Sequence, residues 1–333
     1  MMCSLLTGLS EDARSRLRKS PQPCWIAPML ATLTPERFSR KGWLFEPKWD
    51  GERCLVFGRA DDLIFLSRNK KRLNDRYPEL APAFAKRAIN YFIADGEIVA
   101  FKNGLTSFTE LQKRMQIDNP PRSLLRDVPV YMYLFDLMYL DGYDVRQVRL
   151  LERKMLLHGA FRFGHRLRFT PHREMDGEEY YREACRKGWE GVIAKNGDSK
   201  YVSKRTRDWL KFKCEQGQEF VIGGYTDPQG SRIGLGALLL GFYRKGRLHY
   251  AGKVGTGFDT AMLKSLAQRL RSIETHVSPF ADHDIPQGGV HWVKPELVAQ
   301  IAFTEWTADG RLRHPRFLGL RDDKRPSEVV REG

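Results

Sequence analysis

Phe45-Glu46-Pro47-Lys48-Trp49-Asp50-Gly51-Glu52-Arg53 is the most informative segment of the chain. It predicts a short strand, a tight Asp-Gly turn and a second strand that continues through Phe57. Because side chains alternate along a strand, Glu46 and Lys48 would share one face and present a carboxylate beside an amine. The pattern K-x-D-G-x-R supplies what a lysine that attacks a nucleotide phosphorus needs. An exposed hairpin with a solvated lysine is the simpler alternative.

The composition favours a globular protein with a polyanionic partner. The 333 residues are enough for two domains, and 41% hydrophobic residues are enough for real cores. The formal net charge is +15, which favours nucleic acid as the partner, although a merely soluble basic protein would also carry it. No apolar run reaches about 18 residues, so no membrane span is expected. Residues 1–20 also lack the apolar core of a signal peptide.

The cysteines give no sign of a metal site. They are scattered and form no C-x-x-C pair, and the histidines do not cluster with them. We therefore expect neither a zinc site nor a disulfide framework, and a reducing cytoplasm fits this pattern. The cysteines are Cys3, Cys24, Cys54, Cys185 and Cys214.

The first two thirds of the chain predict a mixed α and β domain. Residues 1–24 are expected to form a weakly ordered leader, and residues 25–213 the domain itself. A long apolar and β-rich run, residues 130–139, predicts a buried strand. The other expected elements are strands at 43–49, 52–57 and 63–67, a helix at 77–89, a strand, turn and strand at 92–100, helices at 108–115, 150–157 and 177–187, and strands at 190–195 and 208–213.

The last of these strands carries two lysines with a fixed relation. Lys211 and Lys213 would lie on one face, while Leu210 and Phe212 would face the other way. Two aligned ammonium groups opposite an apolar face are a good seat for a phosphate. An exposed amphipathic strand would show the same pattern.

Residues 214–333 have a different character, with many glycines and short strands. Hairpins are expected at 236–254 and 298–317, and helical periodicity runs over 260–273. Three strands, a helix and two strands follow the order of an OB barrel, whose strand face and loops commonly bind nucleic acid. We expect an OB-fold domain here, with a generic small β-barrel as the alternative.

Taken in order, these motifs resemble those of ATP-dependent DNA ligases, and more narrowly the ligase module of bacterial and archaeal non-homologous end-joining ligases. The resemblance covers about residues 28–332, and motifs in the family's order are far more specific than any one of them. One departure is Lys70, which follows Asn69 where we would expect glycine. The motifs lie at residues 48–53, 66–69, 95–97, 135–142, 190–195, 209–213 and 313–324, and the subgroup rests on the runs 188–195 and 251–258.

The resemblance implies an α+β fold class: a nucleotidyltransferase domain of the ATP-grasp-like adenylation type, followed by an OB-fold β-barrel. It also implies a reaction in three steps. The Lys48 amine attacks the α-phosphate of ATP and releases pyrophosphate. The AMP then passes to the 5′-phosphate of a broken strand, and the 3′-hydroxyl attacks that phosphate and releases AMP.

The resemblance and the physical needs of this chemistry assign the residues. A free lysine with a pKa of about 10.4 is almost fully protonated at pH 7, so the nucleophile must be activated. Neighbouring cations and a bound metal would favour its neutral form. Mg²⁺, or Mn²⁺, prefers carboxylates and phosphate oxygens, which makes Glu190 and Glu97 the expected ligands. The nucleotide contacts are expected from Glu46, Arg53, Arg68, Glu97, Phe135, Lys211, Lys213, Arg321 and Lys324.

Simpler alternatives exist for two of these residues. Glu97 could be a buried, ion-paired carboxylate, and Phe135 could serve only in core packing. At the level of the whole chain, an RNA ligase or an mRNA capping guanylyltransferase would share the lysyl-nucleotide chemistry. An inactive OB module that only binds nucleic acid is a further alternative, but binding alone would not require Lys48.

The expected partners follow from the same resemblance. They are nicked or broken double-stranded DNA, a Ku-like end-binding protein and separate polymerase or nuclease proteins. Only 47 residues precede Lys48, fewer than the separate DNA-binding domain of the large eukaryotic ligases would need. We expect a monomer in the cytoplasm, associated with the nucleoid when bound to DNA.

Overall fold

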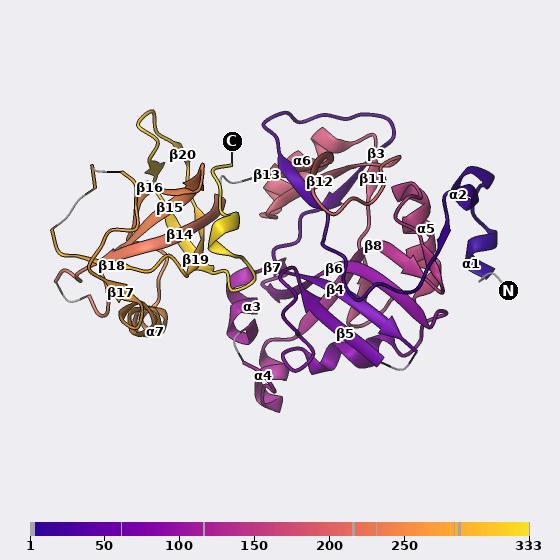
Figure 1. Cartoon of the computed structure of the whole chain (residues 1–333), viewed down its shortest axis with the longest axis horizontal. Helices are drawn as coiled ribbons and strands as arrows, with labels where there is room; N and C mark the ends of the chain where they lie inside the picture. The colour runs from indigo at the N-terminus through magenta and orange to yellow at the C-terminus, as the bar shows by residue number, and fades with distance from the viewer. Residues whose placement is uncertain are drawn as a thin grey trace. The chain divides into compact units, whose positions relative to one another are not determined.

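The structure is a computed structural model that describes residues 4–60, 62–115, 117–214, 217–230, 232–282, 284–285 and 288–332. The chain divides into two compact units, Met1–Cys214 and Glu215–Gly333 (Figure 1). In the described part of the chain, no helix is long and apolar enough to cross a membrane.

The first unit contains two β-sheets. The larger sheet has the strand order β1-β9-β8-β6-β4-β5, with β10 paired to β8 and β7 paired to β6. Its strands are β1 (Arg18–Lys19), β4 (Glu52–Arg59), β5 (Asp62–Ser67), β6 (Tyr91–Lys102), β7 (Leu105–Thr106), β8 (Val130–Leu140), β9 (Tyr143–Asp144) and β10 (Leu167–Phe169). The smaller sheet has the order β11-β3-β12-β13-β2. Its strands are β2 (Leu30–Leu33), β3 (Trp43–Pro47), β11 (Arg173–Glu174), β12 (Gly191–Asn196) and β13 (Arg205–Lys213).

Helices cover these sheets (Figure 1). The amphipathic helix α6 packs Tyr180 and Ala184 on one face of the smaller sheet, against Phe45, Val192 and Phe212. That face is apolar, so Glu46 of β3, Lys195 of β12, and Lys211 and Lys213 of β13 lie on the opposite face. The helices are α1 (Ser4–Thr7), α2 (Glu11–Ser15), α3 (Phe108–Met115), α4 (Arg122–Asp127), α5 (Leu150–Ala160) and α6 (Gly177–Arg186).

The long apolar strand β8 is buried on both faces, as its composition predicted. Met132 and Leu134 belong to the main core, while Phe135 and Met138 belong to a second cluster with Trp209 of the smaller sheet. A strand with two buried faces has no need of a polar alternation, which explains the continuous apolar run.

Two local predictions were wrong. Residues 92–100 form one continuous strand within β6, because Gly96 is not a turn residue but a point of close approach: a Cβ there would meet the Tyr133 carbonyl at 2.5 Å. The expected helix at 77–89 is only a 3-10 helix, Pro78–Phe84. Pro82 inside it has no N–H to donate, and proline disfavours a continued α-helix.

The expected weakly ordered leader is instead packed on the first unit. Leu6 and Leu9 are buried in the main core, and the Ser10 hydroxyl donates to Glu152 of α5. Strand β1 pairs antiparallel with β9. Because acidic and basic residues are mixed through this segment, its few apolar side chains formed no recognisable pattern, and their role in attaching the segment was missed.

The prediction that the chain has no disulfide is also contradicted. Cys185, in the last turn of α6, is bonded to Cys214, the residue that follows β13. The two cysteines are 29 positions apart and form no short motif, so spacing alone could not pair them. Cys24 and Cys54 are free thiols.

The described residues of the second unit form three strands, the α-helix α7 and six further strands, several of them short, where the sequence predicted two strands after the helix. Three strands precede the helix, as expected for an OB fold. Strand β14 pairs with β15, β18 and β19, and the hairpin of β15 and β16 turns at Lys245-Gly246. Asp259 caps helix α7, whose buried leucines and Ala267 follow helical spacing. The elements are β14 (Gly217–Thr226), β15 (Leu238–Arg244), β16 (Arg247–Val254), α7 (Thr260–Arg271), β17 (Glu274–Thr275), β18 (Val290–Val293), β19 (Val298–Ala302), β20 (Glu305–Trp306), β21 (Leu312–Arg313), β22 (Arg316–Leu320) and a 3-10 helix, Pro326–Glu328.

Candidate active site

Lys48 lies where the chain crosses between the two sheets of the first unit. Strand β3 before it belongs to the smaller sheet and β4 after it to the larger sheet, so the expected Asp-Gly turn is not a hairpin. The Lys48 backbone N–H donates to the Gly191 carbonyl at 3.0 Å. The Asp50 carboxylate accepts from the Phe108 N–H at 2.8 Å, at the start of α3. Both bonds fix the backbone around the lysine.

The Lys48 amine forms an ion pair with Glu190, the residue just before β12. Burial alone would lower the pKa of Lys48, but attraction to Glu190, its hydrogen bond, and the charges of Asp50 and Glu97 outweigh burial, so that this pKa is raised. We expected nearby cations to lower it. In this arrangement the carboxylates dominate, and the amine is held in its protonated form.

The strand register gathers the predicted charged residues on one face of the smaller sheet. Ile193 of β12 is the partner of both Glu46 and Lys211, and Gly191 is the partner of Lys213. Lys211 and Lys213 therefore lie on the same face as Glu46, opposite the apolar face covered by α6. Gly191 is required here, because it has a φ of 149° and a Cβ would lie 2.0 Å from the Phe212 carbonyl.

Glu46 sits in a buried cluster with two lysines that we had not singled out. Its carboxylate is ion-paired with Lys154 of α5 and, at 2.6 Å, with Lys195 of β12, and all three side chains are only 2% exposed. Desolvation would raise the pKa of Glu46, but the two ammonium groups lower it. Burial lowers the pKa of Lys195 to about 8, although Glu46 opposes this. For Lys195 the sequence contained two signals, its place in the motif at residues 190–195 and its position on the same strand face as Ile193.

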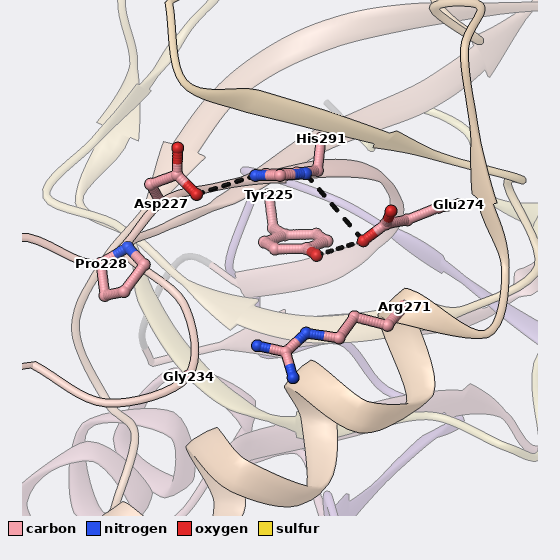
Figure 2. Close-up of a pocket in the computed structure, with 7 residues that line it drawn as sticks. All are labelled: Tyr225, Asp227, Pro228, Gly234, Arg271, Glu274 and His291. Atoms are coloured by element: carbon pink, nitrogen blue, oxygen red, sulfur yellow. Dashed lines mark hydrogen bonds and ion pairs between the residues drawn. The ribbon is translucent and has the colours of Figure 1, made fainter.

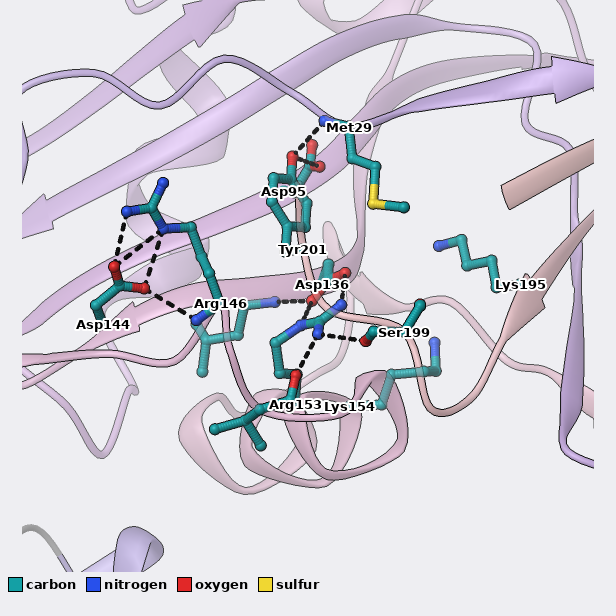
Figure 3. Close-up of polar contacts among 12 residues, drawn as sticks. Met29, Asp95, Asp136, Asp144, Arg146, Arg153, Lys154, Lys195, Ser199 and Tyr201 are labelled. Atoms are coloured by element: carbon teal, nitrogen blue, oxygen red, sulfur yellow. Dashed lines mark hydrogen bonds and ion pairs between the residues drawn. The ribbon is translucent and has the colours of Figure 1, made fainter. Parts of the chain in front are cut away.

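Arg53 is held rigidly at the opposite sheet. Its guanidinium donates twice to Asp95, both times at 2.6 Å, and once to the Met29 carbonyl at 3.2 Å. Tyr201 donates to the same carboxylate at 2.7 Å and accepts from the Met29 N–H (Figure 3). Burial would lower the pKa of Arg53, but the charge and hydrogen bonds of Asp95 outweigh burial, so this pKa is raised. The Arg53 guanidinium therefore stays positively charged.

Glu97 and Phe135 lie on the same face as Arg53. Glu97 is the register partner of Arg53 and acts on the charge of Lys48. Phe135 is 6% exposed, with the Arg53 guanidinium 4.6 Å and the Lys195 Nζ 4.2 Å from its ring centroid. The ring thus already has cationic neighbours, and a stacked adenine at this position stays a prediction.

The remaining predicted residues lie in two other places. Arg68 follows β5, next to Asn69 and Lys70, and Lys70 adopts a φ of 65°, the left-handed conformation that explains our expectation of glycine there. Arg321 and Lys324 belong to the second unit. Arg321 donates twice to Asp323 at 2.8 Å, and Lys324 pairs with Glu219 at 3.0 Å.

The carboxylates near Lys48 fit a divalent cation only together with phosphate oxygens. Among the residues that the structure describes, no three His, Cys, Asp or Glu side chains are grouped to hold a metal ion by themselves. Mg²⁺ is usually bound by one or two carboxylates, waters and substrate phosphates. Glu190 and Glu97 match that requirement, since both act on the same lysine.

A separate pocket of about 410 Å³ lies in the second unit (Figure 2). The His291 ring stacks on Tyr225 with centroids 4.8 Å apart, and its Nε2 is 2.8 Å from Asp227. Burial, followed by a hydrogen bond to Glu274, raises the pKa of Tyr225 to about 12. None of the residues predicted from the sequence lines this pocket, so the chemistry of the chain is assigned to Lys48 and not to this concavity.

Comparison with known proteins identifies both units. Residues 28–213 match the family model described as ATP dependent DNA ligase domain, and residues 231–324 match the ATP dependent DNA ligase C terminal region. The first match alone covers more than half of the chain, and it disfavours an RNA ligase or a capping guanylyltransferase.

Individual relatives support this assignment. The chain is 39% identical over 324 residues to the multifunctional non-homologous end joining protein LigD of Pseudomonas aeruginosa, covering 94% of this chain and 37% of that protein. It is 38% identical over 318 residues to the LigD DNA repair protein of Mycobacterium tuberculosis, covering 92% of this chain and 40% of that protein. The chain therefore spans about two fifths of the length of these relatives.

A solved structure agrees with both the fold and the sequence match. The mycobacterial DNA ligase D complexed with ATP and MES is 36% identical, with a TM-score of 0.65, and the match covers 92% of this chain and 98% of that chain. This confirms a nucleotidyltransferase domain followed by an OB-fold domain. With its ordered motifs, its lysine between two sheets and these matches, the chain belongs to the family of ATP-dependent DNA ligases.

Proposed function

We propose that this chain seals breaks between a 5′-phosphate and a 3′-hydroxyl in double-stranded DNA through an AMP adduct on Lys48. The main support is the position of Lys48 at the crossover between two sheets, where its amine is ion-paired with Glu190. Arg53 on one sheet and the pair Lys211 and Lys213 on the other supply fixed positive charge nearby.

The first step needs a neutral amine at Lys48. Glu190 already holds the Lys48 ammonium, so its carboxylate is placed to accept the proton when the amine attacks. The new bond joins Nζ to the α-phosphorus, and the bond to the pyrophosphate oxygen breaks. Mg²⁺, held by Glu190 and Glu97, would supply charge neutralisation at the phosphate oxygens.

The other residues position and stabilise charge. Lys211, Lys213 and Arg53 would contact phosphate oxygens of the nucleotide, as would Arg68. Glu46 would act through the orientation of β3, since both of its oxygens are held by lysines. Phosphoryl transfer depends almost entirely on such positioning and charge stabilisation.

Labelling with ATP tests this function. With α-labelled ATP and Mg²⁺, the parent should acquire an acid-labile label on a denaturing gel. Lys48→Ala and Lys48→Arg should both lose it, because a guanidinium stays protonated and cannot attack. Lys113→Ala, which removes an exposed lysine paired with Glu110, is the matched control and should label normally. A persistent adduct in either Lys48 variant would remove Lys48 from the mechanism.

The segment from Arg313 to Lys324 would act in the first step only. We infer that Arg321 and Lys324 orient the leaving pyrophosphate, which later steps do not contain. Truncation before Arg313, if the barrel stays folded, should abolish lysine labelling but leave sealing of a nick that already carries AMP. Normal labelling with lost sealing would instead assign this basic segment to DNA.

In the cell, the proposed role is repair of double-strand breaks by end joining, in the cytoplasm and on the nucleoid. The support is the similarity to LigD proteins, whose names include non-homologous end joining. We propose that the chain acts as a monomer beside a Ku-like end-binding protein. Ligation of linear ends that gains nothing from an end-binding partner would contradict this role.

A further inference from the structure

A row of aromatic rings begins beside Lys48 and follows strand β8. The Trp49 ring packs against Tyr133 at a tilt of 34°, with centroids 4.1 Å apart, and its indole N–H donates to the Thr170 hydroxyl at 3.1 Å. Tyr131, two residues earlier on β8, meets Phe101 edge to face at 5.4 Å. Because alternate residues share a face, these tyrosines lie on the face of the sheet that carries the active-site residues.

Two arginines border this row: Arg168 within β10, which pairs with β8, and Arg166, the residue just before β10. Arg168 is the register partner of Tyr133, donates to its hydroxyl at 3.1 Å, and lies over the Tyr131 ring at 4.5 Å. Arg166 lies over the same ring at 5.9 Å and donates to the Val130 carbonyl at 2.8 Å. In the part of the chain that the structure describes, neither guanidinium has a carboxylate within ion-pair distance.

Among the described residues, the lack of an ion-paired carboxylate distinguishes this pair from Arg153 of the same unit. The Arg153 guanidinium holds the buried Asp136 with two hydrogen bonds. If Arg166 and Arg168 only covered the edge of the sheet, there would be no reason for both guanidinium groups to lack an ion-paired carboxylate. The rings of Trp49 and Tyr131 are partly exposed, whereas Tyr133 is buried. Two partly exposed rings beside these guanidinium groups are complementary to a polynucleotide, which offers bases to stack and phosphates to bind.

The charge of the chain supports the same partner. Residues 1–214 carry 40 Lys and Arg against 27 Asp and Glu, whereas residues 215–333 carry 16 against 14. The excess that favours a polyanion therefore lies almost wholly in the unit that contains the aromatic row.

We propose that Trp49, Tyr131, Arg166 and Arg168 form a track for one strand of the DNA substrate. Phosphates next to the break lie on the two guanidinium groups, and the rings support the sugar and base of the end that reacts beside Lys48. This inference rests on the proposed function, because it takes DNA as the substrate.

The test is the double variant Arg166→Gln/Arg168→Gln in the whole chain. Labelling of Lys48 by ATP should be unchanged, which also shows that the variant is folded. Its affinity for a nicked duplex should fall about tenfold or more at low salt, and the slope of log affinity against log salt should decrease by about 2, roughly one for each lost phosphate contact. Sealing of a nick that already carries AMP should slow accordingly.

The matched control is Arg182→Gln/Arg186→Gln, which changes the net charge equally. These side chains are exposed on α6 and paired with Glu179, so this control should change the salt slope little. Equal slopes in the two double variants would overturn the track. Loss of ATP labelling in the Arg166/Arg168 variant alone would also overturn it, because it would assign these arginines to the nucleotide.

A conservative variant separates charge from stacking. Arg168→Lys keeps the charge but loses the planar group over Tyr131, so the salt slope should recover while the affinity stays reduced. If the parent itself takes no label from ATP, the proposed function fails. If the parent is labelled by ATP but its affinity for DNA does not change when both arginines are replaced, only the proposed track is wrong.

Discussion

Two lysine and glutamate pairs, one within the smaller sheet and one at the ends of its strands β3 and β12, have opposite pKa shifts on their lysines. Lys48 and Glu190 are 19% and 27% exposed, and the pKa of Lys48 is raised. Lys195 and Glu46 are both 2% exposed, and burial lowers the pKa of Lys195 to about 8. The same two functional groups are in contact in both places, so the pairing itself does not set the charge state.

The surroundings of each pair explain the difference. Lys48 has further carboxylates near it, Asp50 and Glu97, whereas Lys195 has a second cation, Lys154, on the same carboxylate. The partly exposed pair lies where we propose that the reaction takes place, so a substrate could replace one of its partners. The buried cluster is already complete, which favours a structural role beneath the site.

The largest expected effect comes from removing the carboxylate of the buried cluster. Glu46→Ala would leave two buried ammonium groups without a counter-ion, and such a loss destabilises a protein by about 3–5 kcal/mol. Urea unfolding measures this change. Glu190→Ala is the control, because loss of a partly exposed pair should cost only about 0–1 kcal/mol. Similar losses in the two variants would break the comparison.

A smaller effect is expected at the exposed pair, on the reactivity of Lys48. Glu190→Gln removes the largest attraction that raises the pKa of this amine, so more of it is neutral at pH 8 to 9. Its rate of modification by an amine-reactive reagent should rise, by about tenfold for each unit that the pKa falls. Peptide mapping by mass spectrometry follows Lys48, with exposed Lys113 as the internal control. An unchanged rate would show that Glu190 does not hold the proton.

The smallest effect is a pH dependence from Lys195. Its pKa is lowered from 10.5 to about 8 in the folded chain. Between these values the unfolded chain binds more protons at this group, so the free energy of unfolding should rise with pH, by at most about 1.4 kcal/mol per pH unit. Denaturant unfolding of the parent and of Lys195→Met from pH 7 to 9.5 isolates this contribution. A difference between them that stays constant or shrinks as pH rises would contradict the buried cluster.

Much of the site could be predicted because its residues are local in sequence or aligned by strand register. Lys48, Glu190 and the pair Lys211 and Lys213 lie at strand ends or on alternating positions, where a period of two determines the face. The buried strand β8 and helix α7 could also be predicted, since long periodic or apolar runs are the strongest signals of secondary structure in a sequence.

The rest depended on contacts between distant parts of the chain. Lys154 reaches Glu46 across 108 positions, and no pattern near either residue reveals the other. Asp95-Gly96 read locally as a turn, but pairing with two neighbouring strands kept β6 straight, with an irregular register at that point. Tertiary pairing overrides such local signals, and the sequence contains no short-range trace of it.

The bond between Cys185 and Cys214 makes the stability of the candidate active site depend on the redox conditions in which the protein is kept. It closes a loop that contains Glu190, Lys195, Lys211 and Lys213, because the two cysteines are 29 positions apart. In the chain-entropy model a loop of this length stabilises the folded state by about 3–4 kcal/mol. A sample kept in millimolar dithiothreitol and one kept without it would then melt roughly 10 °C apart, although their sequence is the same.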